Sequence, residues 1–187
     1  MSCTRIAGTV ALAAWMTIPL SAQAVNKQRW LTVPAAHLCT LSVPTTDTKV
    51  RPKATGFRNE GTTNAFVICA FDSGPGQNDI ASPAEPYDPY EIDMWFSGID
   101  GQPHTFTCTA VNSWPGFGIA QMEYISKTVT IDPTNPYPMT GVIWQPQDFF
   151  WGGLTIPTSG AISVTCLLPP GTAILLGGMM VEEDVGS

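Results

Sequence analysis

The chain has 187 residues, with 15 Asp and Glu against 8 Lys and Arg, and its formal net charge is −7. Hydrophobic residues make up 44% of the chain and charged residues only 12%, while Gly and Pro contribute 17 each. This composition excludes wholesale disorder and argues against helix bundles and coiled coils. The negative charge would repel phosphate backbones, so we expect no nucleic-acid partner. The longest basic group is the scattered set Lys49, Arg51, Lys53 and Arg58.

Residues 1–24 have the pattern of a secretory signal peptide. Arg5 provides the positive end, residues 6–20 form an apolar run, and Ala-Gln-Ala ends the segment as a cleavage site. The apolar run is shorter than the ~20 residues that a membrane-spanning helix needs. We therefore expect cleavage before Val25, no membrane span after cleavage, and a single secreted or periplasmic domain over residues 25–187.

Four cysteines follow the signal segment, namely Cys39, Cys69, Cys108 and Cys166. An even number of cysteines in an exported chain predicts two disulfides. Three pairings are open, and we favour Cys39–Cys69 with Cys108–Cys166 because it closes the shorter loops. Metal ligation is the alternative, but the spacings contain no C-x-x-C and neither histidine sits in a ligand pair. We therefore expect no metal at these cysteines.

Apolar and polar residues alternate in many segments, whereas no segment shows a sustained helical period. Taken in chain order, the predicted strands are residues 37–43, 64–71, 90–97, 104–111, 122–125, 127–131, 139–144, 161–168 and 172–176. Gly- and Pro-rich turns separate these segments. Together they predict a single antiparallel β-sandwich of about eight to ten strands, of which the jelly roll is one form.

Three features of these strands carry more specific expectations. Residues 64–71 are nearly all apolar, which predicts a strand buried on both faces at the centre of the core. Asp100-Gly101 is the strongest hairpin signal in the chain, and it predicts that residues 90–97 pair with residues 104–111. Residues 172–176 form an apolar terminal strand, which we expect at a sheet edge that could exchange strands with another copy.

Asp72 is a candidate for catalysis because it lies in the run Ala-Phe-Asp-Ser-Gly at residues 70–74. An apolar strand that ends in Asp-Ser-Gly resembles the aspartic protease signature, whose mechanism needs two carboxylates that share a proton. Pro75 replaces the small residue that those enzymes place next, and no second motif supplies the partner carboxylate. A strand end followed by a turn is the alternative, and we favour it. An aspartic-type hydrolase is therefore the last-ranked function.

Other catalytic groups are scarce. Glu91 and Asp93 lie two apart on one strand face, as a glycosidase pair can, but such a pair on an exposed face usually serves solubility. The chain has 2 His, no G-x-S-x-G elbow and no H-E-x-x-H motif. We expect no enzyme and no cofactor.

The stretch from residue 74 to residue 89 is long and rich in Pro and acid, which predicts an excursion over the surface. With Asp72, its oxygen-bearing side chains form a conceivable calcium site of Asp72, Asn78, Asp79, Glu85 and Asp88. The loop matches no D-x-[DN]-x-[DN]-G pattern. A solvated acidic loop is the alternative, so we assign no metal.

The aromatic residues indicate a binding function. Trp95 falls on the polar face of its predicted strand, beside Glu91 and Asp93. Flat rings with nearby carboxylates and amides suit sugar stacking and contact sites in general. The alternative is that the rings cap the open ends of the sandwich. Trp95 is the first candidate, and four further rings lie in or near loops that contain Gly or Pro: Trp114, Tyr137, Trp144 and Trp151.

The cysteine-bearing segments resemble a set of secreted bacterial proteins of uncharacterised function. In that set a Cys strand is followed by a G-x-x-N turn and a V-x-C strand, and a late V-x-C strand lies near the end. The matching positions here are Cys39, residues 56–59, residues 67–69 and residues 164–166. The resemblance implies a disulfide-stapled β-sandwich in the periplasm or outside the cell, with no catalytic residues to carry over.

We therefore expect a non-enzymatic exported β-sandwich that binds a glycan, an envelope component or a protein partner through exposed aromatic residues. A structural or assembly subunit of a surface appendage is the alternative. Solvent exposure of Trp95 and the other rings would favour the binding protein over the assembly subunit.

Overall fold

The computed structural model describes residues 26–42, 49–71, 89–116, 119–137, 139–149, 156 and 162–184. The expected signal peptide, Asp72, the acidic loop over residues 72–88 and Trp151 lie outside these ranges. Within the ranges, no helix is long and apolar enough to cross a membrane.

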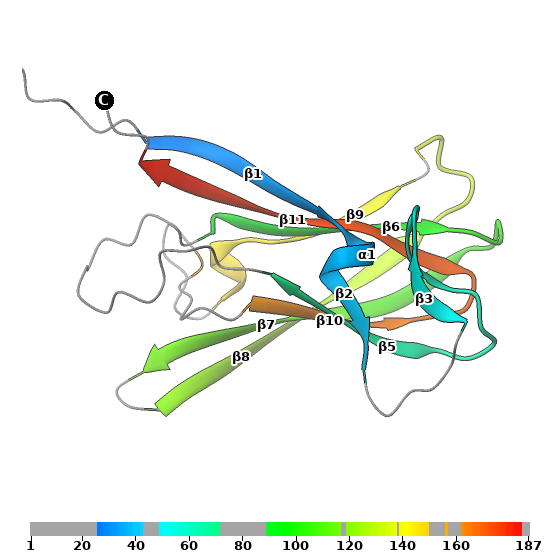
Figure 1. Cartoon of the computed structure of the whole chain (residues 1–187), viewed down its shortest axis with the longest axis horizontal. Coiled ribbons are helices and arrows are strands. Elements are labelled where there is room, and N and C mark those ends of the chain that lie inside the picture. Colours follow the sequence, from blue (N-terminus) through cyan, green and yellow to red (C-terminus); the bar gives the residue numbers. More distant parts are fainter. Residues whose placement is uncertain are drawn as a thin grey trace, which may run out of the picture.

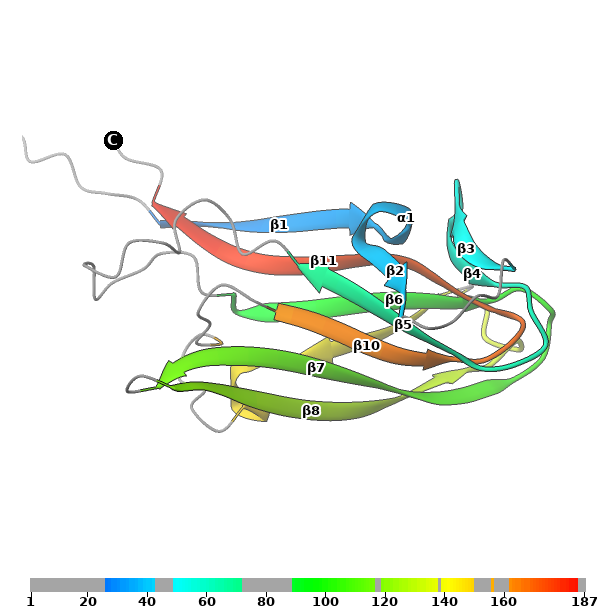
Figure 2. The same ribbon diagram turned by 60° about the horizontal axis from the view of Figure 1, so that its bottom comes forward.

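Two antiparallel sheets pack face to face and form the expected β-sandwich (Figures 1 and 2). The six-stranded sheet has the order β3-β4-β11-β6-β9. β4 pairs with the first three residues of β11, and β1 pairs with residues 176–184 on the same edge. The five-stranded sheet has the order β2-β5-β10-β7-β8.

The strands of the six-stranded sheet are β1 (Asn26–Pro34), β3 (Val50–Lys53), β4 (Gly56–Asn59), β6 (Glu91–Gly98), β9 (Thr140–Trp144) and β11 (Thr172–Asp184). Those of the five-stranded sheet are β2 (Cys39–Leu41), β5 (Ala65–Phe71), β7 (His104–Gly116), β8 (Ile119–Ile131) and β10 (Ile162–Leu168). A short helix, α1 (Ala35–Leu38), joins β1 to β2, and a 3-10 helix, η1 (Pro146–Asp148), follows β9.

The core lies between the two inward faces, because period-two alternation sends the apolar residues of each strand to one side. In β6, the side chains of Ile92, Met94 and Phe96 are fully buried, and in β10 those of Val164 and Leu168 are as well. Burial of such a side chain contributes about 1.5–3 kcal/mol to folding. This alternation confirms the all-β prediction.

The strand expected to be buried on both faces, β5, is buried on one face only. Val67 and Cys69 point into the core with no exposed area, but Phe66 is 54% exposed. β5 pairs with β2 and β10 inside the five-stranded sheet, and among the described residues no third layer covers the outer face of that sheet. Its apolar run therefore gives the sheet an apolar outer surface as well as a core face.

The expected hairpin at Asp100-Gly101 is wrong. β6 pairs with β11 and β9, whereas β7 pairs with β8 and β10 in the other sheet. The turn therefore carries the chain from one sheet to the other. The strands face each other across the core, where Phe96 and Phe106 meet edge to face with ring centroids 5.3 Å apart. The apolar faces of β6 and β7 are therefore buried against each other across the core, and the two strands are not neighbours in one sheet.

The terminal strand is also not at an edge. Residues 172–176 belong to β11, which lies between β6 on one side and β4 and β1 on the other. Both backbone edges of this segment are paired over most of its length, so its apolar character reflects a central position.

The structure contains both expected disulfides, Cys39–Cys69 and Cys108–Cys166. Each bridge joins directly opposite residues of neighbouring strands, β2 with β5 and β7 with β10. All four cysteines are buried. The two bridges therefore staple the five-stranded sheet from its inner face, and such bridges are typical of proteins from oxidising compartments.

Candidate functional site

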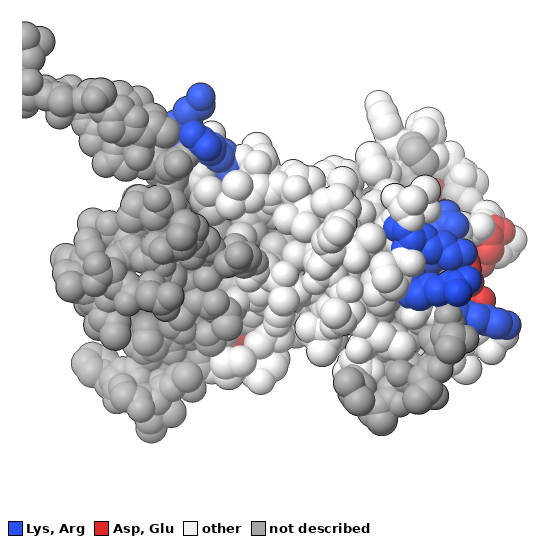
Figure 3. All heavy atoms as spheres, viewed as in Figure 1, with Lys and Arg blue, Asp and Glu red and all other residues white. Residues whose placement is uncertain are grey.

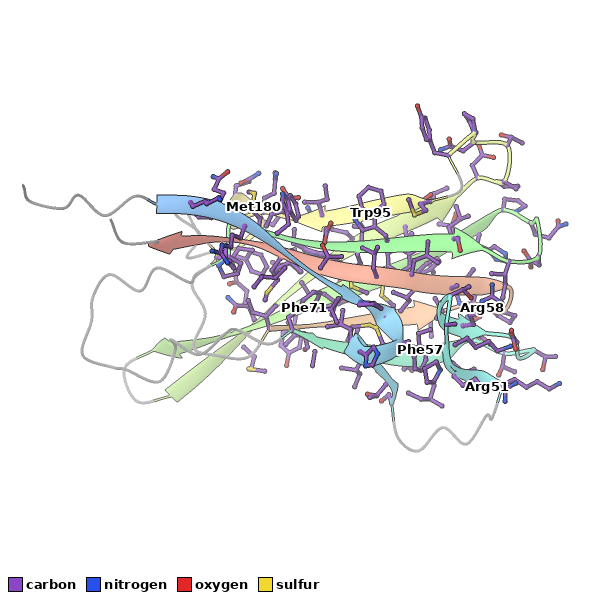
Figure 4. All side chains as sticks on the ribbon, turned by 45° about the horizontal axis from the view of Figure 1, so that its top comes forward. Arg51, Phe57, Arg58, Phe71, Trp95 and Met180 are labelled. Carbon is purple, nitrogen blue, oxygen red and sulfur yellow. A yellow bond between two sulfur atoms is a disulfide. The ribbon has the colours of Figure 1, made fainter. Side chains whose placement is uncertain are left out.

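The outer face of the six-stranded sheet carries the residues that were predicted on the polar face of the strand over residues 90–97. Since Ile92, Met94 and Phe96 point inward, the alternating residues Glu91, Asp93, Trp95 and Ser97 of β6 point outward. Trp95 is half-buried on this face, next to β9 on one side and β11 on the other. Figure 4 shows Trp95 on β6 and Met180 further along β11, beside β1.

The indole of Trp95 lies face-on over Gly141, its direct partner in β9. A methyl group on Gly141 would come within 3.2–3.3 Å of three consecutive carbons of the six-membered ring, Cη2, Cζ3 and Cε3. Nearly equal distances to three adjacent ring atoms place that methyl position on the axis of the ring rather than at its edge. The ring therefore packs face-on against Gly141, and it needs a residue without a side chain at that position.

Asp93 fixes the other end of the indole. The Nε1–H of Trp95 donates to Oδ2 of Asp93 at 2.6 Å. Asp93 is only 7% exposed, and its Oδ1 is buried without a hydrogen-bond partner in the described part of the chain. This oxygen lies over Gly178, where a methyl group would approach it to 2.5 Å. A hydrogen bond to a carboxylate is among the stronger kinds, so Asp93 restricts rotation of the ring.

Two further contacts hold β9 in place beneath the ring. Trp144 is fully buried, and its Nε1–H donates to the carbonyl oxygen of Ile125 in β8 at 2.9 Å. Lys127 of β8 donates to the carbonyl oxygen of Ile143 at 2.7 Å and to Oδ2 of Asp148 at 2.6 Å. These contacts tie the edge strand β9 to the opposite sheet. Gly141 therefore has a defined position under Trp95.

Apolar side chains border the ring, and polar groups lie at one end of the face. Met139 and Ile143 are 43% and 38% exposed on the β9 side of the ring. Toward the start of β6, Nε2 of Gln145 donates to Oε2 of Glu91 at 3.3 Å, and Nε2 of Gln147 donates to Oε1 of Gln145 at 2.6 Å. The face thus combines a flat ring with amides and a carboxylate.

A cleft of about 700 Å³ adjoins the other end of this face. Ser97 and Gly98 of β6 and Arg58 of β4 lie in its wall, together with Asp100. A smaller cleft of about 230 Å³ shares Gly98 with it and is lined by Tyr137. Both openings lie at the end of the sandwich where β6 turns toward β7.

The Asp100 carboxyl in the larger cleft is already bound within the chain. Its Oδ1 accepts hydrogen bonds from the backbone N–H of Gln102 and from Nε2 of His104, both at 2.9 Å. Partial burial raises the pKa of Asp100, but these hydrogen bonds outweigh it and hold the pKa below its ordinary value. The carboxylate is therefore charged, and its Oδ1 is occupied within the chain.

The predicted aromatic residues do not form one group. Trp95 lies on the outer sheet face and Tyr137 is 77% exposed in the connection between β8 and β9. Trp144 is fully buried, so its ring is inaccessible to a ligand and serves the core. The side chain of Trp114 and all of Trp151 lie outside what the structure describes.

Sequence reasoning missed Trp30. This residue is 52% exposed and pairs with Met180, which in turn pairs with Glu91, so Trp30 shares the outer face with Trp95. Two strand spacings and four residues of rise separate the two tryptophans by roughly 16 Å. Trp30 and Thr32 lie two residues apart, as residues on one face of a strand do. This spacing was the available signal, but no strand was predicted over residues 26–34.

Comparisons with known proteins give only distant structural likenesses. No family model matches the chain, and no curated protein matches it. The solved structure of TmCBM61 in complex with β-1,4-galactotriose aligns at 10% identity and a TM-score of 0.36, covering 83% of this chain and 88% of that chain.

Two further solved structures align at similar levels. A CBM4 structure has 9% identity and a TM-score of 0.31, with 68% of each chain covered. The family 11 carbohydrate-binding module from Clostridium thermocellum, in complex with a β-1,3-1,4-mixed-linked tetrasaccharide, has 9% identity and a TM-score of 0.32. That alignment covers 91% of this chain and 92% of the module. Likenesses this distant assign neither a family nor a ligand, so function has to be argued from the residues of this chain.

Proposed function

We propose that the protein is an exported, non-catalytic β-sandwich that binds a glycan across the outer face of its six-stranded sheet. The observation that carries this proposal is the flat placement of the Trp95 ring over Gly141. A ring that packs one face against a glycine presents its other face to a ligand. The apolar C–H face of a sugar ring matches such a surface in size and polarity.

The surroundings of Trp95 favour a sugar over a purely apolar ligand. The ring is held from two sides, by Asp93 through its Nε1–H and by the backbone of Gly141 beneath it, so little conformational freedom is lost when a ligand binds. Glu91 and Gln145 supply acceptors and an amide donor on the same face. Sugar hydroxyls require such groups within reach of the stacked ring.

The same geometry argues against glycoside hydrolysis at this face. A glycosidase needs two carboxylates on either side of the scissile bond. Asp93 is almost fully buried, and its Oδ2 accepts the hydrogen bond from Trp95. Only Glu91 of the pair is accessible, so Asp93 acts as a positioning residue for the ring.

Two buried disulfides in one sheet support an oxidising compartment as the place of action. Together with the signal-like residues 1–24, they favour a secreted or periplasmic protein. Glycans of the envelope or of the surroundings are available ligands there.

Glycan-array binding of the wild-type chain and of Trp95→Ala tests the proposal. We expect Trp95→Ala to lower affinity for the bound glycan about tenfold or more, which corresponds to ~1.4 kcal/mol. Tyr124→Ala is the matched control, because Tyr124 is 64% exposed on the outer face of the other sheet. Unchanged affinity in Trp95→Ala, or an equal loss in both variants, would contradict the proposal.

One observation favours assembly as a second function. The described outward positions of β5, β7, β8 and β10 carry no charged residue, and Phe66, Met122 and Tyr124 are each at least 50% exposed among them. Uncharged sheet faces of this kind serve as contact surfaces. Light scattering over a range of concentrations tests it: polymers that Tyr124→Lys abolishes would support an assembly subunit, and a concentration-independent monomer would exclude one.

A further inference from the structure

The β3–β4 hairpin concentrates positive charge in a chain whose net charge is −7. Half of the 8 Lys and Arg of the chain lie between residues 49 and 58. Figure 3 shows these side chains gathered at one end of the molecule, separated by uncharged surface from a second basic group at the start of β1. The basic residues of the hairpin region are Lys49, Arg51, Lys53 and Arg58.

Glu60, the acid that faces this group, is bound to Lys53. Nζ of Lys53 donates to Oε1 and Oε2 of Glu60 at 2.5 and 2.6 Å. This hydrogen bond is the main reason why the pKa of Glu60 is lowered, with smaller effects from the charges of Lys53, Arg51 and Arg58 and with burial acting in the opposite direction. Arg58 comes no closer to Glu60 than 3.6 Å. Glu60 therefore binds Lys53 most closely and forms a longer ion pair with Arg58, so one carboxylate faces the three positive charges of Lys53, Arg51 and Arg58.

The two arginines face each other beside Glu60, whose pKa both of their charges lower. Arg51 of β3 lies directly opposite Arg58 of β4, and like charges in this relation destabilise a strand pair. Among the described residues, the buried Nε of Arg58 has no hydrogen-bond partner and Arg51 forms no ion pair. Arg51 is exposed and the Arg58 side chain is 29% exposed, so their terminal N–H groups are suited to a planar anionic group, which a guanidinium binds through paired N–H groups.

The cleft beside Arg58 connects this pair to the Trp95 platform. Arg58 and Ser97 line the same cleft, and Ser97 lies two residues from Trp95 on the same outer face. The carboxylates of the cleft are occupied, Asp100 by Gln102 and His104 and Glu60 by Lys53. Among the residues that line the cleft, Arg58 carries the positive charge. Figure 4 shows Arg51 and Arg58 at the β3–β4 end and Trp95 on β6.

We propose that the glycan is acidic, and that Arg58 and Arg51 bind a carboxylate or sulfate group of the chain whose neutral part stacks on Trp95. This inference rests on the proposed glycan-binding function and names its ligand class. Two strand spacings and two residues of rise separate Arg58 from Trp95 by roughly 12 Å. The anionic group therefore lies two to three sugar units from the stacked ring.

Matched pairs of soluble glycans test the inference. Polygalacturonate oligomers and their carboxyl-reduced form probe a carboxylate, and dextran sulfate and dextran probe a sulfate. We expect the wild-type chain to bind the anionic member of one pair at least about tenfold more tightly in low salt, with the difference shrinking as salt is added. The pair that shows the difference identifies the anionic group.

Charge-neutral variants locate the effect. Arg58→Gln and the exposed Arg51→Gln should each remove most of the preference for the anionic member and leave affinity for the neutral member unchanged. Lys27→Gln removes the same charge at the far end of the molecule and should leave the preference intact. Circular dichroism shows whether Arg58→Gln is folded. If Arg58→Gln is unfolded, Arg51→Gln alone tests the anionic subsite.

The failures of the two proposals are distinguishable. Equal binding of the neutral and anionic members, or a loss of preference in Lys27→Gln as large as in Arg51→Gln, overturns the anionic subsite and leaves glycan binding standing. Absence of binding to all four probes, or full binding in Trp95→Ala, overturns the proposed function itself.

Discussion

Gly141 is the residue on which the flat placement of Trp95 depends. Gly141→Val would put methyl groups where the six-membered ring now lies, so we expect the indole to tilt off the sheet and glycan affinity to fall about tenfold or more. Val is a better strand former than Gly, so the free energy of unfolding should change by no more than about 1 kcal/mol. Tryptophan near-ultraviolet circular dichroism and calorimetric titration measure the two effects.

Ile143→Val is the matched control for Gly141→Val. It keeps an aliphatic side chain on the same strand face and places nothing under the ring, so binding should be nearly unchanged. A Gly141→Val chain with wild-type affinity and an unaltered tryptophan spectrum would show that the ring does not need the glycine.

The sequence supports the role of Trp95 but not that of its partners. Alternation over residues 90–97 was enough to place Trp95 outward, because Ile92, Met94 and Phe96 occupy the other phase. The glycine under the ring could not be predicted, because its position depends on the strand register that sets Gly141 opposite Trp95. Trp144 illustrates the reverse case: it was predicted at the end of a strand beside turn residues and taken as a candidate binding ring, but its strand carries it into the core.

At the scale of elements, both disulfides join strands of the five-stranded sheet, whereas Trp95 lies on the six-stranded sheet. The Cys108–Cys166 bridge closes a loop of 58 residues, and chain entropy values such a bridge at about 4.2 kcal/mol. We therefore expect the double substitution Cys108→Ala with Cys166→Ala to lower the free energy of unfolding by about 4 kcal/mol. Urea denaturation of the oxidised proteins measures it.

Any folded fraction of that double variant should still bind the glycan of the wild-type chain, because neither cysteine lies in the six-stranded sheet. The variant that lacks Cys39 and Cys69 is the comparison, with a loop of 30 residues and an expected loss of about 3.6 kcal/mol. A loss below 1 kcal/mol in both variants would mean that the bridges add little to the strand pairing around them.

The strands also show what a local turn signal does not predict. Asp100-Gly101 does form a tight turn, with the Asp100 carboxylate accepting from the backbone of Gln102. The turn is tied to the β10–β11 connection through the N–H of Ile99, which donates to the carbonyl oxygen of Gly171. A turn signal specifies a reversal of direction but not the sheet that the returning strand joins. That choice depends on burying the apolar faces of β6 and β7 against each other.

For the whole molecule, alternation and cysteine arithmetic were sufficient for the sandwich and for both disulfides. Alternation reports one buried face per strand, and the shorter loops fit strands that are neighbours in space. Neither signal predicts the order of the strands within a sheet. In the structure, β11 lies in the centre of its sheet and β9 lies at an edge. The sequence showed the basic residues of the proposed anionic subsite but not their arrangement, because Arg51 and Arg58 become neighbours only through the β3–β4 pairing.

The same end of the molecule should control its acid stability. Lys53 lowers the pKa of Glu60 by hydrogen bonding. Burial, the largest single effect on Asp100, raises its pKa, but the hydrogen bonds from His104 and Gln102 together outweigh burial and lower it. A carboxyl with a lowered pKa in the folded state binds fewer protons there than in the unfolded chain, so its contribution is complete above the unfolded pKa of about 4 and is lost as pH falls through the folded value. We expect urea midpoints to fall steeply below pH ~4. Glu60→Gln and Lys53→Gln should each flatten that fall, and their combination should flatten it no further, because they remove one shared interaction. A wild-type slope in both single variants would mean that the Lys53–Glu60 pair does not stabilise the fold.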